Sequence, residues 1–182
     1  MLTLAVGWVA SFNCPAAWAA EESVTMRNQS LHITVRDHDG AFELWSAELH
    51  NPILVARVGA EVNHHWMWSS DYPKHKTVTS TFQSPLGAGH QAEVSFTGLA
   101  GKPDLKYVLR LYDDLPFGDI QASVTNTTHE EIRVQDIRVL DAFGAEHLVD
   151  LGGPQASDRI LSDSYSEDRP PVHIFDLGKA PP

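Results

Sequence analysis

The stretch "LKYVLRLYDDLPFGDIQASVTN", residues 105–126, has the pattern of two β-strands separated by a turn. In its first half one set of alternate positions is Leu105, Tyr107, Leu109 and Leu111. A period of two places this set on one face of a strand, which predicts that the face is buried. The central "DLPFG" supplies turn-forming residues, and "DIQASVTN" then resumes the strand-like composition.

The same alternation continues through most of the chain from residue 30 onward. The strand-like runs are 31–37, 41–49, 52–62, 76–84, 90–98, 105–114, 119–126 and 131–142. Breakers such as "SPLGAG" and "GLAGKPD" separate them, and no run of ten or more residues has a helical period. Roughly eight to ten strands at this spacing predict an all-β fold, an antiparallel β-sandwich, over residues 21–150.

One predicted strand, residues 131–142, changes its buried face part-way along. Val134 belongs to one alternating set, whereas Ile137 belongs to the other. A shift of one residue in a strand turns every later side chain to the opposite face. We therefore expect a β-bulge or register break near Gln135-Asp136.

Length and charge narrow the possible functions. The 182 residues favour one domain, alone or with trailing pieces, and a hydrophobic fraction of 42% is enough for a core. The formal net charge is -11, with 24 acidic residues against 13 Lys and Arg. Because nucleic-acid affinity depends largely on basic side chains that neutralise phosphates, we expect no nucleic-acid partner.

Residues 1–20, "MLTLAVGWVASFNCPAAWAA", have the features of a signal peptide. They form an uncharged apolar stretch that ends with the small-x-small pattern of Ala17-Trp18-Ala19. The apolar run is shorter than the ~20 residues that span a bilayer, so we expect no membrane anchor. The prediction is a secreted or periplasmic protein, and the alternative is that this segment is a short buried helix or strand. Removal of residues 1–20 would also remove Cys14, so the fold would depend on its core and not on disulfides.

The composition of the sequence changes after Asp150. Residues 151–182 are rich in turn formers and contain only two short apolar runs. We predict that they form an irregular exit segment or linker that leads towards a missing catalytic domain.

A family resemblance rests on "YVLRLYDDLPFGDIQASVTNTTHEEIRVQDIRVLDA", residues 107–142. This stretch resembles the N-terminal β-sandwich domain of glycoside hydrolase family 36, the melibiase-type α-galactosidases, and galactose-mutarotase-like sandwiches share much of its texture. "RILSDSYSEDRPP", residues 159–171, is similar to the segment where such proteins leave the sandwich. The resemblance implies a large sandwich placed before a (β/α)₈ barrel that carries the catalytic aspartates.

The barrel of the family is absent from this chain, because a barrel needs about 250 residues. No catalytic residue of the family can therefore be assigned here, and we expect no glycoside hydrolysis by the chain alone. The partners that the resemblance implies are a carbohydrate and a C-terminal catalytic barrel.

The aromatic stretch "NHHWMWSSDY", residues 63–72, supplies the substrate-binding candidates Trp66 and Trp68. In the family a loop of the sandwich leans over the barrel mouth and can present an aromatic residue to the sugar. A flat ring can bury the apolar face of a pyranose without needing hydrogen bonds. The alternative is that both rings pack in the core or cover an interface. A loop would splay the two rings, so we expect one to anchor in the sandwich and the other to be exposed.

The same region holds possible metal ligands, namely His64, His65, Asp71 and His75. Adjacent histidines on a strand point to opposite faces, so His64 and His65 cannot both bind one ion without a bend. We therefore predict no metal site and no cofactor. The paired acids Asp113-Asp114, Glu130-Glu131 and Glu167-Asp168 are interpreted as solvated turns.

These observations favour a non-catalytic N-terminal β-sandwich module of an exported α-galactosidase-like glycoside hydrolase. Such a module would support the catalytic barrel and could lend an aromatic loop to sugar binding. Two alternatives stay open. The chain could be a free-standing carbohydrate-binding or lectin-like sandwich, or a structural or adhesion domain whose aromatic residues serve a protein interface.

Overall fold

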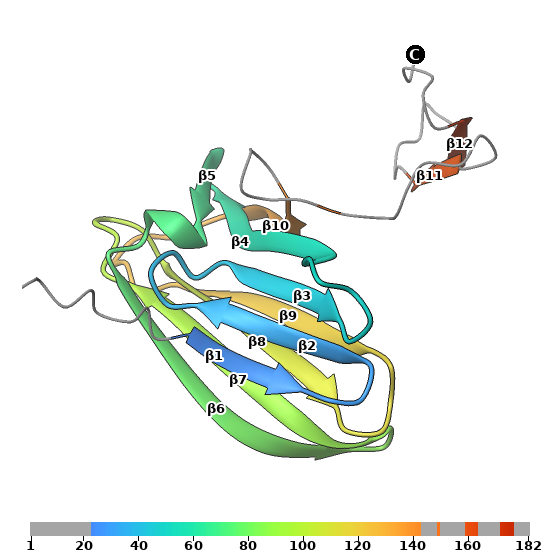
Figure 1. Ribbon diagram of the computed structural model, residues 1–182. Coiled ribbons are helices and arrows are strands. Elements are labelled where there is room, and N and C mark those ends of the chain that lie inside the picture. The colour runs from blue at the N-terminus through green and yellow to red at the C-terminus, as the bar shows by residue number, and fades with distance from the viewer. Residues whose placement is uncertain (1–22, 143–148, 150–158, 164–171, 177–182) are drawn as a thin grey trace, which may run out of the picture.

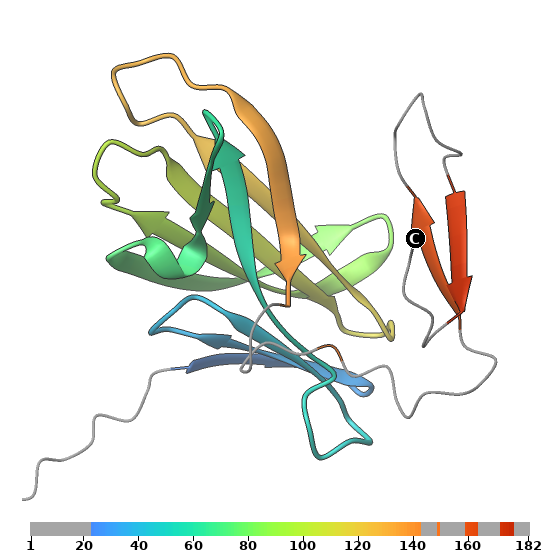
Figure 2. The same ribbon diagram turned by 90° about the horizontal axis from the view of Figure 1, so that it is seen from above.

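Two antiparallel β-sheets face each other in the computed structural model of the protein (Figures 1 and 2). The structure describes residues 23–142 and 149, together with strands at 159–163 and 172–176. The predicted all-β antiparallel sandwich is confirmed. The predicted signal peptide, residues 1–20, lies outside the described residues.

The first sheet is organised around β4. Its strands are β1 (Ser23–Arg27), β2 (Leu31–Arg36), β3 (Phe42–Ser46), β4 (Leu54–Val62) and β10 (Val134–Asp141), in that spatial order, with β5 (His65–Trp68) paired to β4. The first half of β4 pairs with β3, and its second half pairs with β5. β10 lies along the other edge of β4. Three strands thus pair with one nine-residue strand: its two neighbours in the sequence, β3 and β5, and the distant β10.

The second sheet is a meander in which each strand pairs with the next along the chain. It consists of β6 (Lys74–Ser84), β7 (Gly87–Thr97), β8 (Asp104–Tyr112) and β9 (Gly118–Thr125). The stretch at residues 105–126 provides most of β8, the connecting turn and β9, as its pattern predicts.

The predicted break near Gln135-Asp136 is confirmed. The pairing of β10 with β4 shifts register between Val134 and Asp136, and again between Arg138 and Asp141. At each shift β10 has one more residue than β4 uses to pair with it, which is the arrangement of a β-bulge. The second shift has the further effect of placing Asp141 opposite Arg57.

Four strands do not appear among the runs that the alternation identifies. β1 and β5 are short, with five and four residues. The other two, β11 (Arg159–Asp163) and β12 (Val172–Asp176), form an antiparallel hairpin within the segment expected to be irregular. They coincide with the two short apolar runs of that segment.

The core lies between the two sheets and is closed by aromatic side chains. Tyr107 of β8 is fully buried, and its hydroxyl donates a hydrogen bond to the Gly40 carbonyl of the β2–β3 turn at 2.9 Å. Gly40 has a φ of 62°, and a Cβ there would lie 2.1 Å from the ring of Phe96, so only glycine fits. Within the described residues, helix is limited to the 3₁₀ turn η1 (Ser69–Asp71), and no helix could cross a membrane.

Candidate functional site

The aromatic stretch is part of a β-hairpin and not a loop. β4 and β5 are joined by the two-residue turn Asn63-His64, in which both residues have positive φ values, 50° and 64°. Such a turn matches the twist of the strands that it connects. Asn63 also joins the hairpin to the start of β10, because its backbone N–H donates to the Arg133 carbonyl and its side-chain oxygen accepts from the Arg133 N–H, each at 2.9 Å.

Strand alternation divides the large side chains of this stretch between two faces. Met67 and, beyond η1, Tyr72 point into the core, where they are 1% and 3% exposed. Trp66 and Trp68 lie on the outer face of the first sheet and are half-buried. The expectation that the two rings splay is therefore wrong, because a strand, unlike a loop, keeps alternate residues on one side.

The two indoles form a parallel stack that continues into arginines on both sides. The Trp66 and Trp68 ring centroids are 4.9 Å apart, and their planes differ by 8°. The Arg57 guanidinium of β4 lies 4.2 Å from the Trp68 centroid, and the Arg138 guanidinium of β10 lies 4.2 Å from the Trp66 centroid. The space between the rings is too narrow for a guanidinium, so each arginine covers the outer face of its ring. We call these four residues the Trp–Arg stack.

One carboxylate, that of Asp141, pairs with both arginines of the Trp–Arg stack. Arg57 Nε donates to Asp141 Oδ2 at 2.8 Å, and Arg57 Nη1 donates to the Ser70 hydroxyl at 3.2 Å. The Asp141 side chain is only 11% exposed, and its other oxygen lies 3.9 Å from Arg138 Nη1. The nearly buried carboxylate is thus hydrogen-bonded to Arg57 and lies within ion-pair distance of the half-exposed Arg138.

Gly59 of β4 makes room for the Trp–Arg stack on the sheet surface. It is the cross-strand partner of Trp68, and a Cβ at this position would lie 2.2 Å from the Trp68 ring. The indole thus rests directly on the backbone of β4. Any larger residue at this position would have to displace the ring.

Asp71 and Tyr72 anchor the end of the aromatic stretch. Asp71 Oδ2 accepts a hydrogen bond from the Trp68 N–H at 2.8 Å, and the Tyr72 hydroxyl donates to the Pro103 carbonyl at 2.7 Å. Burial, with a smaller effect of the nearby Asp104 and Asp71 carboxylates, raises the pKa of Tyr72 to about 12. The phenol is therefore a structural hydrogen-bond donor at neutral pH.

The histidines of the metal hypothesis do not converge. His64 and His65 are exposed at the hairpin turn, and the Asp71 carboxylate is used by the Trp68 amide. His75 Nδ1 lies 3.1 Å from the Asp37 carbonyl, and its ring contacts Phe96 edge-on. In the part of the chain that the structure describes, no three His, Cys, Asp or Glu side chains gather as metal ligands.

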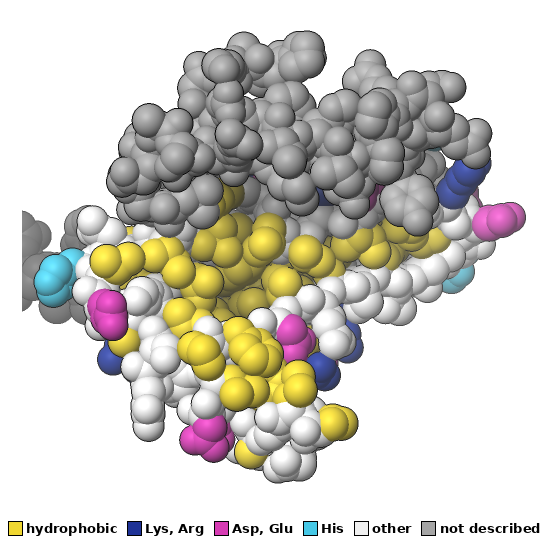
Figure 3. Space-filling model, turned by 90° about the vertical axis from the view of Figure 1, so that its right-hand side faces the viewer, with side chains coloured by type: hydrophobic (Ala, Val, Ile, Leu, Met, Phe, Trp, Pro, Cys, Tyr) yellow, Lys and Arg dark blue, Asp and Glu magenta, His cyan; other side chains and the backbone are white. Residues whose placement is uncertain are grey.

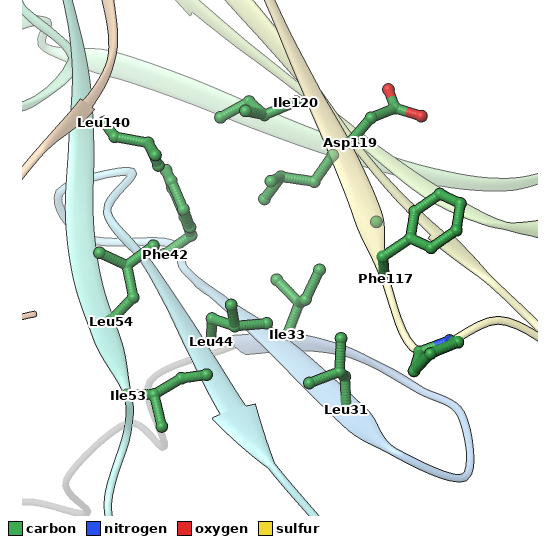
Figure 4. Close-up of a pocket in the computed structure, with 13 residues that line it drawn as sticks. Leu31, Ile33, Phe42, Leu44, Ile53, Leu54, Phe117, Asp119, Ile120 and Leu140 are labelled. Atoms are coloured by element: carbon green, nitrogen blue, oxygen red, sulfur yellow. The ribbon is translucent and has the colours of Figure 1, made fainter. Parts of the chain in front are cut away.

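A second feature, which the sequence pattern does not reveal, is an apolar groove of about 420 Å³ where the two sheets separate (Figure 4). One wall includes Leu31, Ile33 and Leu44 of the first sheet, and the other includes Phe117 and Ile120. Leu54 of β4 and Leu140 of β10 also line it. Figure 3 shows hydrophobic side chains gathered on this side of the molecule. A run such as "DLPFG" identifies a turn, but it does not indicate that Phe117 stays 43% exposed at the edge of a groove.

The ring faces, ring edges and arginine N–H groups that remain exposed decide what the Trp–Arg stack can bind. Each indole has one face against the other indole and one against a guanidinium, so a sugar could lie flat on a ring only after displacing an arginine. The exposed edges of the rings and the arginine N–H groups are available to a partner with complementary apolar and acidic groups. Sugar contact by Trp66 and Trp68 stays a prediction. Arg57, Arg138 and Asp141, which the stack requires, are not among the candidate residues predicted from the sequence.

Comparison with protein family models, curated proteins and solved structures gives no match for this chain.

Proposed function

We propose that this chain is a non-catalytic β-sandwich module of an exported, α-galactosidase-like glycoside hydrolase and that it supports a catalytic barrel. The observation that carries this proposal is the Trp–Arg stack, a partly exposed row of stacked side chains on the outer face of the first sheet. The family and the barrel come from the resemblance at residues 107–142. The geometry supports the more general part of the proposal, which is a docking role.

The composition of the Trp–Arg stack suits a protein interface. Tryptophan and arginine are, with tyrosine, enriched among the residues that dominate binding energy at interfaces. Stacking and the contacts with Asp141 already restrict these side chains, so a partner loses little conformational entropy when it binds them. A surface of this kind favours contact with a second folded domain.

The acidic pairs of the described residues support a role without catalysis. Glycosidases need two carboxyl groups that face each other across a cleft, about 5–9.5 Å apart. Glu130 and Glu131 are exposed between β9 and β10. Asp113 follows β8, and its half-exposed carboxylate lies 3.6 Å from His90. Neither pair lines the apolar groove or touches the Trp–Arg stack.

A second candidate function is carbohydrate binding by a free-standing sandwich. The outward orientation of Trp66 and Trp68 favours it, since carbohydrate-binding surfaces present aromatic rings to solvent. The arginine on each outer face opposes it. If this candidate were correct, Arg138→Ala would uncover the Trp66 face and strengthen galactoside binding, whereas a docking surface would gain no sugar affinity from that change.

The experiment that tests the proposal combines an activity assay with a binding assay. The purified chain should not release nitrophenol from nitrophenyl α-galactoside, and calorimetric titration with melibiose should give no measurable binding for either the unmodified chain or Arg138→Ala. The coding sequence downstream of Pro182, or an adjacent gene, should encode a (β/α)₈ barrel. Hydrolysis that a carboxylate substitution abolishes would refute the non-catalytic role, and tight melibiose binding would favour the second candidate.

A further inference from the structure

The apolar groove is a second surface of the molecule, distinct from the Trp–Arg stack, and its edge is open to solvent. Phe117 and Leu140 at its edge are 43% and 52% exposed. Asp119 is the charged residue among its lining side chains, and its Oδ2 accepts a hydrogen bond from the Tyr112 hydroxyl at 3.3 Å. In Figure 4 the labelled leucine and isoleucine side chains converge on the hollow, whereas the Asp119 carboxylate points away. A contiguous apolar surface of this kind is a typical docking site.

The chain itself returns to this groove after leaving β10. Val149 forms an isolated antiparallel bridge with Leu54, and Leu54 lines the groove. The hairpin β11–β12 begins at Arg159, so residues 150–158 connect it to this point. Fully extended, that connection spans at most about 35 Å. The hairpin is therefore tethered within reach of the groove.

The hairpin β11–β12 needs a surface to pack on. A single two-stranded hairpin is marginally stable at best in water, because it has no second layer to bury its apolar face. The register of β11–β12 places Leu161 opposite Ile174 and Ile160 opposite Phe175. Val172 follows the alternation of Ile174, so by sequence one face of the hairpin has three apolar positions.

The hairpin also lies on the appropriate side of the molecule. Figure 1 shows β11 and β12 beyond the right-hand end of the sandwich, and Figure 3 shows hydrophobic side chains on that same right-hand side. Because the hairpin is tethered, its effective concentration at the groove reaches the millimolar range for a short flexible connection. This favours the hairpin over a second copy of the chain as the occupant.

We propose that the C-terminal hairpin β11–β12 docks on the apolar groove of its own chain and completes the sandwich core there. This inference goes beyond the proposed function, since it concerns a different surface and needs no catalytic partner. In the docked state the apolar residues of the hairpin cover Phe117 and Leu140. Residues 151–182 then contribute part of the folded domain, in place of a linker alone.

Hydrogen exchange measured by mass spectrometry on the full chain tests this docking. Amides of residues 159–163 and 172–176 should be protected in the unmodified chain. Phe117→Asp and Leu140→Asp place a charge in opposite walls of the groove, and each should raise exchange at the hairpin by at least about tenfold. Leu86→Asp is the matched control, since Leu86 is 61% exposed in the β6–β7 turn and does not line the groove.

The amides of β7 and β8 report whether each variant still folds. If an aspartate variant loses protection in β7 and β8, the alanine variant at the same position is used instead to measure hydrogen exchange at the hairpin. Hairpin amides that exchange like a free peptide in the unmodified chain would refute the proposal. So would equal exchange in the groove variants and the control, or hairpin protection that depends on protein concentration, which would indicate a second copy.

Discussion

Gly59→Ala should destabilise the protein by forcing Trp68 off the sheet. In most strands this substitution is tolerated, because alanine loses less conformational entropy than glycine on folding and stabilises the protein by about 0.4–1 kcal/mol where it fits. Here the added Cβ would lie 2.2 Å from Trp68 Cε3 and 2.4 Å from Cζ3. Both atoms belong to a rigid ring stacked on Trp66, so the ring must move as a whole.

The size of the effect follows from the contacts that the displaced ring loses. Stacked aromatic pairs contribute about 0.5–1.5 kcal/mol beyond their buried area, and a cation–π contact at an exposed site contributes about 0.5–1 kcal/mol. Trp68 makes one contact of each kind, with Trp66 and Arg57. The lost contacts sum to about 1–2.5 kcal/mol, so after the favourable backbone effect Gly59→Ala should lower the free energy of unfolding by up to about 2 kcal/mol.

A double-mutant cycle isolates this clash. In a Trp68→Ala background the ring is absent, so Gly59→Ala should become neutral or stabilise by up to about 1 kcal/mol. Urea denaturation of the four proteins gives the coupling energy, expected near 2 kcal/mol. Circular dichroism provides an independent reading, because the exciton couplet of two stacked indoles should weaken in Gly59→Ala. If Gly59→Ala costs the same free energy with and without Trp68, the steric argument is wrong.

His64→Gly should raise the free energy of unfolding by about 0.5–1 kcal/mol in urea denaturation, because the exposed His64 has a φ of 64° that glycine adopts without strain; an unchanged midpoint would contradict strain at this turn. Asn28→Ala should lower the free energy of unfolding by about 2 kcal/mol, since the Asn28 amide donates to the Tyr112 carbonyl at 2.7 Å and to the Leu115 carbonyl at 2.8 Å. A loss below about 0.5 kcal/mol would show that water replaces these two hydrogen bonds. Burial raises the pKa of Tyr72 to about 12, so its contribution to stability is complete below pH ~10 and is lost as the pH rises to about 12. Tyr72→Phe should make the urea midpoint less sensitive to pH across that range, and an equal decline in both proteins would refute the assignment.

The strands that sequence analysis identified are those with a strong periodic signal. β8 alternates from Asp104 to Leu111 because one face packs against the core and the other does not. β5 has only four residues, and bulky side chains occupy both of its faces, so its alternation is hidden. The pairing of β4 with β10 joins residues that are 72 (Val62 and Val134) to 84 (Arg57 and Asp141) positions apart, and no local pattern specifies such a pairing.

The site was predicted in part for the same reason. Alternation alone places Trp66 and Trp68 on one side of a strand, and the two-residue turn at Asn63-His64 makes the stretch a strand. The arginines that cover the rings come from β4 and β10. The position of these arginines depends on the register between β4 and β10. The second β-bulge of β10, between Arg138 and Asp141, brings Asp141 opposite Arg57, and the alternation of the sequence does not locate this bulge.

The central place of β4 in the first sheet sets the order in which a growing chain can fold. The meander β6–β9 requires only residues 74–125, and each of its hairpins can close as soon as its second strand has been synthesised. β4 is made earlier, but one of its edges remains unpaired until β10 emerges. The second sheet can thus be completed before the first, although the first begins at Ser23. During synthesis the open edge of β4 is available for wrong strand pairing until β10 emerges, and a chaperone that binds extended segments would protect it.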